Sequence, residues 1–247
     1  MSEKVNKSKH NLRAKIIRLK EKIVTQTTIG ILRPFNRHQM VDLDHVRSDP
    51  DNPIVFLGNH AEIYGPIASA LCFPVPVRFW VISKMMFKKR DVRAYMYENT
   101  FSKKTYLPVF IRRILAWYLG WLSVNVMNAL RAIPVYRDSP MKLRDTLRQS
   151  VEALSNGENL MIFPEHPEGK YVKSGISELS PGFLMIAEAW WKKSGKKLRI
   201  MPVFANREKR TFTFGNEITY EPENGYAAEQ GRILKEAYEQ LVALSEK

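Results

Sequence analysis

Short apolar runs recur along the chain, separated by stretches whose apolar residues have helical spacing. Four runs have the length and composition of buried strands: 54–58, 132–135, 160–163 and 199–205. Residues 211–220 alternate between apolar and polar side chains around Gly215 and Asn216, as a further strand does. Because the predicted strands alternate with helices, we expect an α/β fold in which helices cover a mixed sheet.

Helical periodicity is clearest between residues 141 and 156. Apolar residues there recur at intervals of four, four and three: Leu143, Leu147, Val151 and Leu154. Gly157 ends this helix, and two more are expected over 183–192 and 227–244. Ligands of an α/β sheet bind where strands end in loops, so we expect the chemistry in the loops that follow the predicted strands.

The first 37 residues are predicted to form a basic amphipathic helix that ends near residues 30–34. Its apolar residues fall on one helical stripe, and cations flank them: Leu12, Ile16, Leu19 and Ile23 with Arg13, Lys15, Arg18, Lys20 and Lys22. This pattern is typical of a helix that lies on an anionic membrane surface. We therefore expect a membrane-associating helix over 1–37 and a single domain over 38–247.

A second candidate membrane surface lies between Tyr106 and Arg131. It combines aromatic and aliphatic residues with two arginines: Ile111, Leu115, Trp117, Tyr118, Trp121 and Leu122 with Arg112 and Arg113. The uncharged run 114–130 has 17 residues and contains two asparagines, whereas a membrane span takes about 20 predominantly apolar residues. We therefore expect peripheral association. In the alternative interpretation, both helices pack on the core of the protein.

Charge and cysteine content narrow the functional classes. The 247 residues include 39 Lys and Arg against 25 Asp and Glu, and the formal net charge of +14 predicts an anionic partner. The single cysteine, Cys72, excludes a disulfide framework and a multi-cysteine metal site. No nucleic-acid-binding motif accompanies the charge, and the first residues lack the form of a signal peptide. We expect a protein at the cytoplasmic face of a membrane, with no nucleic-acid partner.

Asn59, His60 and Glu62 follow the first predicted strand. Imidazole titrates near neutral pH, so a histidine at the end of a strand is suited to act as a general base. Glu62 can orient the ring or stabilise its charge. The alternative is a solvated or structural histidine with no part in catalysis.

Further charged residues follow the next two predicted strands. Arg137 comes after 132–135, where a guanidinium can bind a phosphate through two hydrogen bonds or take part in a surface salt bridge. The loop after 160–163 contains two prolines and several polar residues: Glu165, His166, Glu168, Gly169 and Lys170. Such a loop can hold a hydroxyl-binding carboxylate beside a phosphate-binding lysine. A metal site formed by His60 and His166 is an alternative, but the sequence lacks a closely spaced ligand pair, and we expect no metal or cofactor.

In their order and spacing, these blocks resemble the glycerolipid acyltransferase family, which includes the lysophosphatidic acid acyltransferases. The resemblance covers about residues 55–220. The family's Asn-His pair, its apolar stretch ending in arginine, its Phe-Pro-Glu-Gly block and its apolar strand with Pro-Val are matched in turn: Asn59-His60, Ala132 to Arg137, Phe163-Pro164-Glu165, and Ile200 to Val203 with Pro202. Four such blocks in order are a specific signal.

Two positions depart from the family's pattern. Gly65 stands where the family has an aspartate, five residues after the histidine. The third block has three extra residues, so either Glu165 or Glu168, which Gly169 follows, corresponds to the family's glutamate. Our hypothesis is that Glu62 replaces the missing aspartate, with Glu165 and Glu168 as the other candidates.

The resemblance implies that 38–247 is an acyltransferase domain acting in phospholipid biosynthesis. A fatty acyl group would pass from acyl-CoA or acyl carrier protein to a hydroxyl of lysophosphatidic acid or a related lysolipid. His60 would be the base and Glu62 its partner, and substrate would be bound by the remaining candidates: Asn59, Arg137, Glu165, Glu168, Gly169, Lys170 and Pro202. Two alternatives stay open: a different acceptor such as a glycolipid, or a non-catalytic lipid-binding relative.

Overall fold

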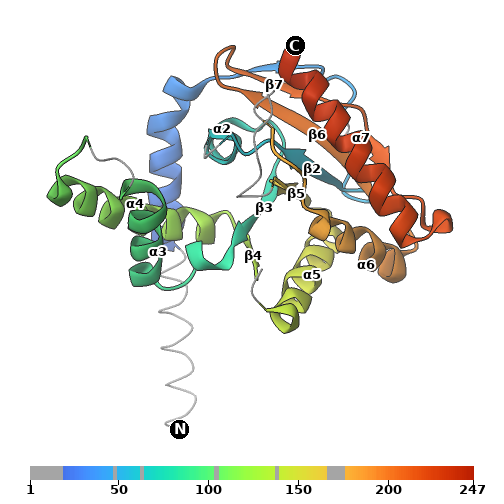
Figure 1. Cartoon of the computed structure of the whole chain (residues 1–247), viewed down its shortest axis with the longest axis horizontal. Coiled ribbons are helices and arrows are strands. Elements are labelled where there is room, and N and C mark those ends of the chain that lie inside the picture. Colours follow the sequence, from blue (N-terminus) through green and yellow to red (C-terminus); the bar gives the residue numbers. More distant parts are fainter. Residues whose placement is uncertain (1–18, 47–48, 62–63, 103–105, 137–138, 166–175) are drawn as a thin grey trace, which may run out of the picture. The chain divides into compact units, whose positions relative to one another are not determined.

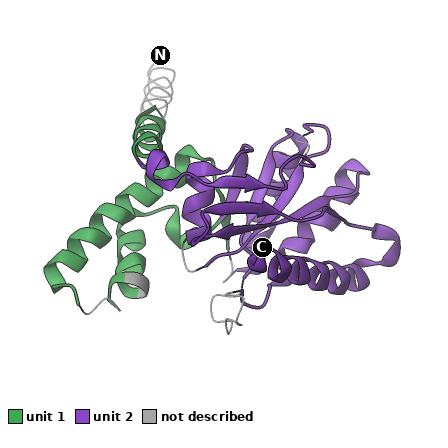
Figure 2. Ribbon diagram, turned by 90° about the horizontal axis from the view of Figure 1, so that it is seen from above, with its two compact units in different colours: residues 1–31, 81–138 green, residues 32–80, 139–247 purple. Residues whose placement is uncertain are grey.

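The structure is a computed structural model that describes residues 19–46, 49–61, 64–102, 106–136, 139–165 and 176–247 (Figure 1). The chain divides into two compact units, each made of two segments (Figure 2). Unit 1 comprises residues 1–31 and 81–138, and unit 2 comprises residues 32–80 and 139–247. The sequence does not predict this division, because no linker-like composition marks residue 80 or residue 139.

Eight strands in the described part of the chain form one mixed sheet in the order β1-β7-β6-β2-β5-β3-β4, with β8 beside β6. Their bounds are β1 (Gln39–Val41), β2 (Ile54–Gly58), β3 (Val77–Ile82), β4 (Ile133–Val135), β5 (Asn159–Ile162), β6 (Arg199–Asn206), β7 (Thr211–Phe214) and β8 (Ile218–Thr219). β2 pairs in parallel with both β5 and β6, whereas β7 and β8 run antiparallel to β6. The predicted α/β fold with a mixed sheet is confirmed.

β2 lies at the centre of unit 2, and all five of its residues are buried. Leu57 pairs with Ile162 of β5 on one side and with Pro202 of β6 on the other. The three strands are parallel, so the loops that follow Gly58, Ile162 and Asn206 leave the sheet at the same edge. We call this edge the carboxyl edge, and it is where the sequence predicts the chemistry.

Helices and helical turns complete both units. Unit 2 contains η1 (Arg33–Asn36), α2 (Tyr64–Cys72), α5 (Pro140–Ser155), η4 (Pro181–Leu184), α6 (Met185–Ser194), η5 (Pro222–Asn224) and α7 (Tyr226–Glu246). Unit 1 contains the helical residues up to 31 of a helix over 19–32, together with η2 (Ser83–Met85), α3 (Lys89–Met96), η3 (Tyr97–Phe101) and α4 (Val109–Ala129). The helices expected over 141–156 and 227–244 are therefore confirmed.

Two predicted elements differ from the structure. Residues 211–220 form two strands, β7 and β8, which are separated by residues 215–217 and both pair antiparallel with β6. At Gly215 the chain lies close to α7, where a Cβ would be 2.5 Å from Gln240 Oε1. The helix expected from residue 183 is regular only from Met185. Pro181 begins a 3₁₀ turn over the four preceding residues, and proline is compatible with the first turn of a helix.

Unit 1 packs its helices through small residues and polar contacts. Gly120 of α4 allows α3 to approach closely, since a Cβ there would lie 2.9 Å from Arg93 Cγ. Asn128 Nδ2 donates a hydrogen bond to Glu21 Oε1 at 2.9 Å, which joins α4 to the helix over 19–32. The described residues contain no helix that is long and apolar enough to cross a membrane.

The predicted membrane surface of residues 106–131 is partly exposed in unit 1. Trp117 and Tyr118 are half exposed, and Phe110 and Ile114 are more exposed still. Ile111, Leu115, Trp121 and Leu122 have intermediate exposure. In the other predicted stripe, Leu19 and Ile23 are exposed, whereas Leu12 and Ile16 lie outside the described residues.

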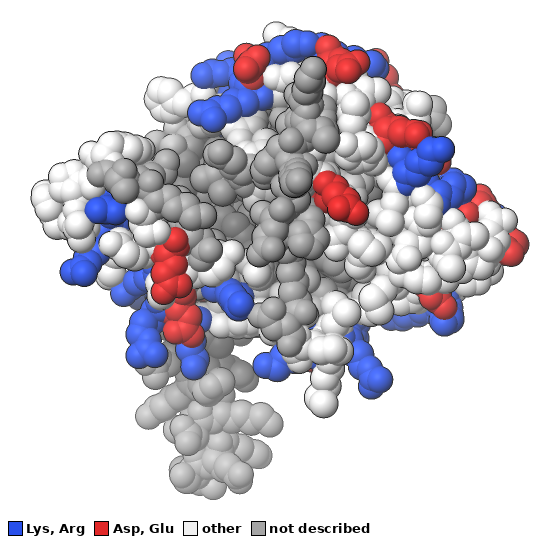
Figure 3. Space-filling view, viewed as in Figure 1, with Lys and Arg blue, Asp and Glu red and all other residues white. Residues whose placement is uncertain are grey.

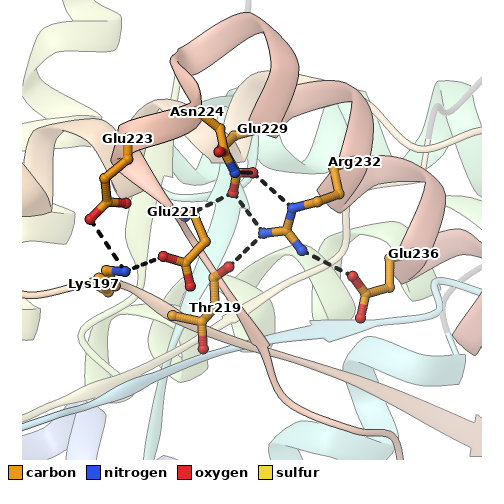
Figure 4. A network of polar contacts seen from close by, with 8 residues as sticks. All are labelled: Lys197, Thr219, Glu221, Glu223, Asn224, Glu229, Arg232 and Glu236. Atoms are coloured by element: carbon orange, nitrogen blue, oxygen red, sulfur yellow. Dashed lines mark hydrogen bonds and ion pairs between the residues drawn. The ribbon is translucent and has the colours of Figure 1, made fainter.

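An ion-pair network fixes the start of α7 on unit 2 (Figure 4). Arg232 donates hydrogen bonds to both oxygens of the buried Glu229, to Glu236 Oε2 and to Thr219 O. Glu229 also accepts hydrogen bonds from Glu221 N and Asn224 Nδ2. These donors, Arg232 first, lower the pKa of Glu229 to about 2. Beside them, Lys197 pairs with Glu221 and Glu223.

Candidate functional site

His60 lies on a tight turn between β2 and α2, at the carboxyl edge of the sheet. Gly65 N donates a hydrogen bond to His60 O at 3.2 Å, and Tyr64 N donates one to Ala61 O at 3.1 Å. Ala61 has a φ of 41°, in the left-handed region that side chains with a Cβ rarely adopt. Such backbone strain is concentrated at functional sites, and here it adjoins the predicted base.

Asn59 joins this turn to β6. Its Nδ2 donates a hydrogen bond to Ala205 O at 3.2 Å, and its Oδ1 accepts one from Ala205 N at 2.7 Å. The side chain is almost completely buried, so both polar groups are used within the protein. The structure therefore gives Asn59 an anchoring role: it holds the residue before His60 against the end of β6.

Glu165 joins the turn to the loop after β5. Its Oε1 accepts a hydrogen bond from the backbone N of His60 at 2.7 Å, and its Oε2 accepts one from Ser177 Oγ at 3.4 Å. Only 3% of Glu165 is exposed, and this burial raises the pKa of its carboxyl, although the hydrogen bonds from His60 and Ser177 oppose the rise. The carboxylate thus faces the protein's own backbone and positions His60 through its N–H.

Phe163 forms an apolar wall beside the imidazole. Its ring centroid lies 5.9 Å from that of His60 in an edge-to-face arrangement, and 6.5 Å from that of Phe79 in a stacked one. The absence of a side chain at Gly58 makes room for this ring, because a Cβ there would lie 2.7 Å from Phe163 Cε1. The third sequence block therefore contributes both the carboxylate and an apolar surface to the surroundings of His60.

Gly65 cannot carry a side chain in this structure. A Cβ at this position would lie 1.9 Å from Asn59 O, far inside any real contact distance. The glycine is therefore required by the tight turn itself. An aspartate at this position would need a different path of the backbone between β2 and α2.

Pro202 is buried within β6, beside Leu57 of β2. Its carbonyl oxygen accepts a hydrogen bond from Gly215 N at 2.8 Å. The structure thus places this predicted substrate-binding residue inside the sheet, four residues before the end of β6. Its observed contacts support the strand and not an open binding surface.

The described residues include only some of the predicted site. Those that the structure brings together at the carboxyl edge are Asn59, His60 and Glu165. Apart from Pro202 in β6, the others lie outside the described residues: Glu62, Arg137, His166, Glu168, Gly169 and Lys170. Their roles stay predictions.

The structure adds a histidine–tyrosine pair that the sequence did not single out. His38 Nε2 lies 2.5 Å from Tyr64 Oη, and its Nδ1 lies 2.6 Å from Asn36 O. Burial raises the pKa of Tyr64, and the charges of Arg210 and Arg207 oppose that rise. No pattern predicted the pair, since the short strand after His38 and the helix that begins at Tyr64 were both missed.

Cys72 contacts the same carbonyl oxygen, Asn36 O, as His38. Its Sγ donates a hydrogen bond to Asn36 O at 2.8 Å, and burial raises the pKa of the thiol. A raised pKa disfavours the thiolate, which is the reactive form of cysteine. Within the described residues, no three His, Cys, Asp or Glu side chains are grouped so that they could hold a metal ion.

Comparisons with known proteins add no family assignment. A scan of the chain against protein-family models finds no match, and a search of curated proteins finds no significant similarity.

Proposed function

We propose that this protein is an O-acyltransferase that moves a fatty acyl group from a thioester to a hydroxyl of a lysolipid. The observation that best supports this function is the joining of two of the sequence blocks with the end of β6 at the carboxyl edge. Asn59 anchors the turn to β6, Glu165 binds the backbone of His60 from the loop after β5, and the histidine lies between them. A base held in this way on a strained turn is suited to repeated proton transfer.

In the proposed reaction, the imidazole of His60 accepts the proton of the acceptor hydroxyl as its oxygen attacks the thioester carbon. The carbonyl π electrons move to oxygen, which gives a tetrahedral oxyanion. When the C=O bond re-forms, the C–S bond breaks and the thiolate leaves with the bonding pair. The imidazolium returns its proton to that thiolate, so the products are an ester and a thiol, and the enzyme regains its starting state.

The roles of the other residues follow from what they contact. Glu165 acts as a positioning residue, because both of its oxygens bind the protein itself. Phe163 limits access of water to one side of the imidazole. Glu62 remains our candidate for orienting the imidazolium, and Arg137 and Lys170 remain candidates for binding the acceptor's phosphate. No cofactor is part of this proposal.

One observation favours a second candidate, a non-catalytic lipid-binding relative. The turn has no space for a side chain at Gly65, so the carboxylate that the family resemblance would require there is excluded by the backbone. If no other carboxylate replaces it, the site would bind lipid without transferring an acyl group. Both candidate functions require binding of a lipid, and in both cases we propose peripheral association with the cytoplasmic face of a membrane.

The experiment is transfer of a labelled long-chain acyl group to lysophosphatidic acid, with acyl-CoA and acyl carrier protein tested as separate donors. We expect wild-type protein to form the diacyl product and the His60→Ala variant to form none, with unchanged circular dichroism. A His60→Ala variant with full activity would remove His60 as the base. Wild-type protein that is inactive with a panel of lysolipid and glycolipid acceptors, yet binds them, would favour the lipid-binding candidate.

A further inference from the structure

Cations and exposed apolar side chains gather on unit 2 beside the candidate site. We call this set the arginine surface: Arg33, Arg37, Arg207 and Arg210 with Leu32, Phe35 and Ile67. Its members come from residues 32–37 in and around η1, from α2 and from the turn between β6 and β7. Figure 3 shows blue Lys and Arg atoms, with some red acidic atoms, along the upper edge of the view, where Figure 1 draws the turn between β6 and β7.

Contacts within unit 2 hold these segments together. Arg207 Cζ lies 5.9 Å from the centroid of the Tyr64 ring, and Arg210 Nη1 donates a hydrogen bond to Phe35 O at 3.4 Å. Cys72 of α2 donates to Asn36 O in η1. The arginine surface is therefore built from three chain segments that touch one another.

The arginines of this surface have no anionic partner in the described part of the protein. None of the four forms an ion pair with a described carboxylate, and all four are exposed. Glu208 is the one acidic residue in the turn that carries Arg207 and Arg210. Guanidinium groups bind phosphate oxygens in a bidentate manner, so this charge is complementary to phosphate.

The exposed apolar side chains of the arginine surface favour a lipid membrane over a soluble phosphate as its ligand. Phe35, whose carbonyl oxygen accepts from Arg210, is 72% exposed, and Ile67 of α2 is 47% exposed. A soluble anion gains nothing from such side chains. At a bilayer they enter the boundary between headgroups and acyl chains while the arginines bind the phosphates.

We propose that the arginine surface docks unit 2 on the phosphate headgroups of an anionic lipid membrane. The inference deepens the proposed function, on which it depends for the lipid nature of the substrate. Asn59, next to His60, is bonded to Ala205, two residues before Arg207, so the docked surface adjoins the carboxyl edge. Docking here brings the candidate base toward the lipid surface from which a lysolipid acceptor would be taken.

The test is binding of the full chain to vesicles of phosphatidylcholine with and without one third phosphatidylglycerol. The variant replaces Arg33, Arg37, Arg207 and Arg210 with glutamine. The matched control replaces four exposed cations elsewhere on unit 2 with glutamine: Arg144, Arg148, Lys193 and Lys235. Both variants lose the same net charge, so general electrostatic attraction falls equally in the two proteins.

We expect the arginine-surface variant to bind anionic vesicles at least about tenfold more weakly than the control variant. The Phe35→Ser variant should also lose affinity, and most clearly at high salt, where the apolar contribution dominates. Equal affinities of the two four-residue variants would overturn the proposal. A second result would also overturn it: the arginine substitutions abolish binding of inorganic pyrophosphate but leave vesicle binding equal to that of the control variant. The arginine surface would then bind a soluble phosphate.

Vesicle binding needs no turnover, so it is independent of the proposed chemistry. If the His60→Ala variant loses acyl transfer but binds vesicles with unchanged affinity, both the proposed reaction and the docking surface are supported. If vesicle binding depends on the arginine surface but the protein has no transferase activity, the docking surface is supported and the proposed reaction is contradicted.

Discussion

Glu165 was identified from the sequence pattern, but its role in the structure differs from the predicted one. The pattern predicted a carboxylate in the loop after 160–163, and suggested that it binds a substrate hydroxyl. In the structure this carboxylate is buried and accepts a hydrogen bond from the N–H of His60. A sequence gives the position of a carboxylate but not the direction in which a loop turns it, so this role could not be predicted.

The Glu165→Gln variant tests this positioning role. The amide keeps one oxygen for the His60 N–H, but its NH₂ group then replaces the oxygen that accepts from Ser177. We expect kcat to fall about tenfold to a hundredfold with KM nearly unchanged, because the base is displaced while substrate contacts remain. The control is Glu178→Gln, an exposed glutamate in the same segment. A raised KM with unchanged kcat would instead make Glu165 a substrate-binding residue.

Gly65 gives a second residue-level prediction, which is independent of activity. A methyl group at this position would lie 1.9 Å from Asn59 O, so we expect Gly65→Ala to lower the free energy of unfolding by about 3 kcal/mol. Gly182→Ala is the matched control, since nothing lies within 4 Å of its Cβ position. Urea unfolding of both variants measures the difference. Similar stabilities would show that the turn before α2 is not as tight as described.

Three of the four strands predicted from apolar runs share one physical property, whereas β4, the fourth, lies at the edge of the sheet. β2, β5 and β6 are central or nearly central in the sheet, and strands buried on both faces have continuous apolar sequences. β3 was missed because its sequence contains Arg78, a charged residue that pairs with Glu158 at 3.2 Å in the structure. α2 was missed because Gly65 and Pro66 near its start are poor helix formers, and its position depends on the turn after β2.

The network at the start of α7 predicts how stability depends on pH. The pKa of Glu229 is about 2 in the folded protein and near 4.5 when unfolded, so its contribution is complete above pH 4.5 and is lost as pH falls toward 2. That shift corresponds to about 3 kcal/mol at neutral pH. We therefore expect wild type to be more stable than Glu229→Gln at pH 7, with the difference shrinking between pH 4.5 and 2. Urea titrations across this range measure it.

The Glu152→Gln variant is the control for the pH dependence of stability. Glu152→Gln removes an exposed carboxylate from α5 and should change stability little at any pH in the series. A stability difference between wild type and Glu229→Gln that stays constant down to pH 2 would show that the network does not lower the pKa of Glu229.

At the scale of the whole molecule, the sheet agrees with the prediction from the sequence, whereas the division into two units was not predicted. The four apolar runs coincide with β2, β4, β5 and β6, and three residues of the predicted site, Asn59, His60 and Glu165, lie together at the carboxyl edge. The two-unit division could not be predicted, because it arises from contacts between α3, α4 and the helix over 19–32 that no local pattern encodes. The described residues that support the proposed function, His60, Asn59 and Glu165, all lie in unit 2.

The central claim is direct, base-catalysed acyl transfer by His60, and release of thiol from a long-chain acyl thioester tests it most directly. We predict that wild-type protein releases thiol only when lysophosphatidic acid is present, in equal amount to the diacyl product. The His60→Ala variant should release none, whereas His45→Ala, which changes a histidine bonded to Gly215 O, should behave as wild type. Thiol release in a burst without acceptor, or equal release by the His60→Ala variant, would contradict the account.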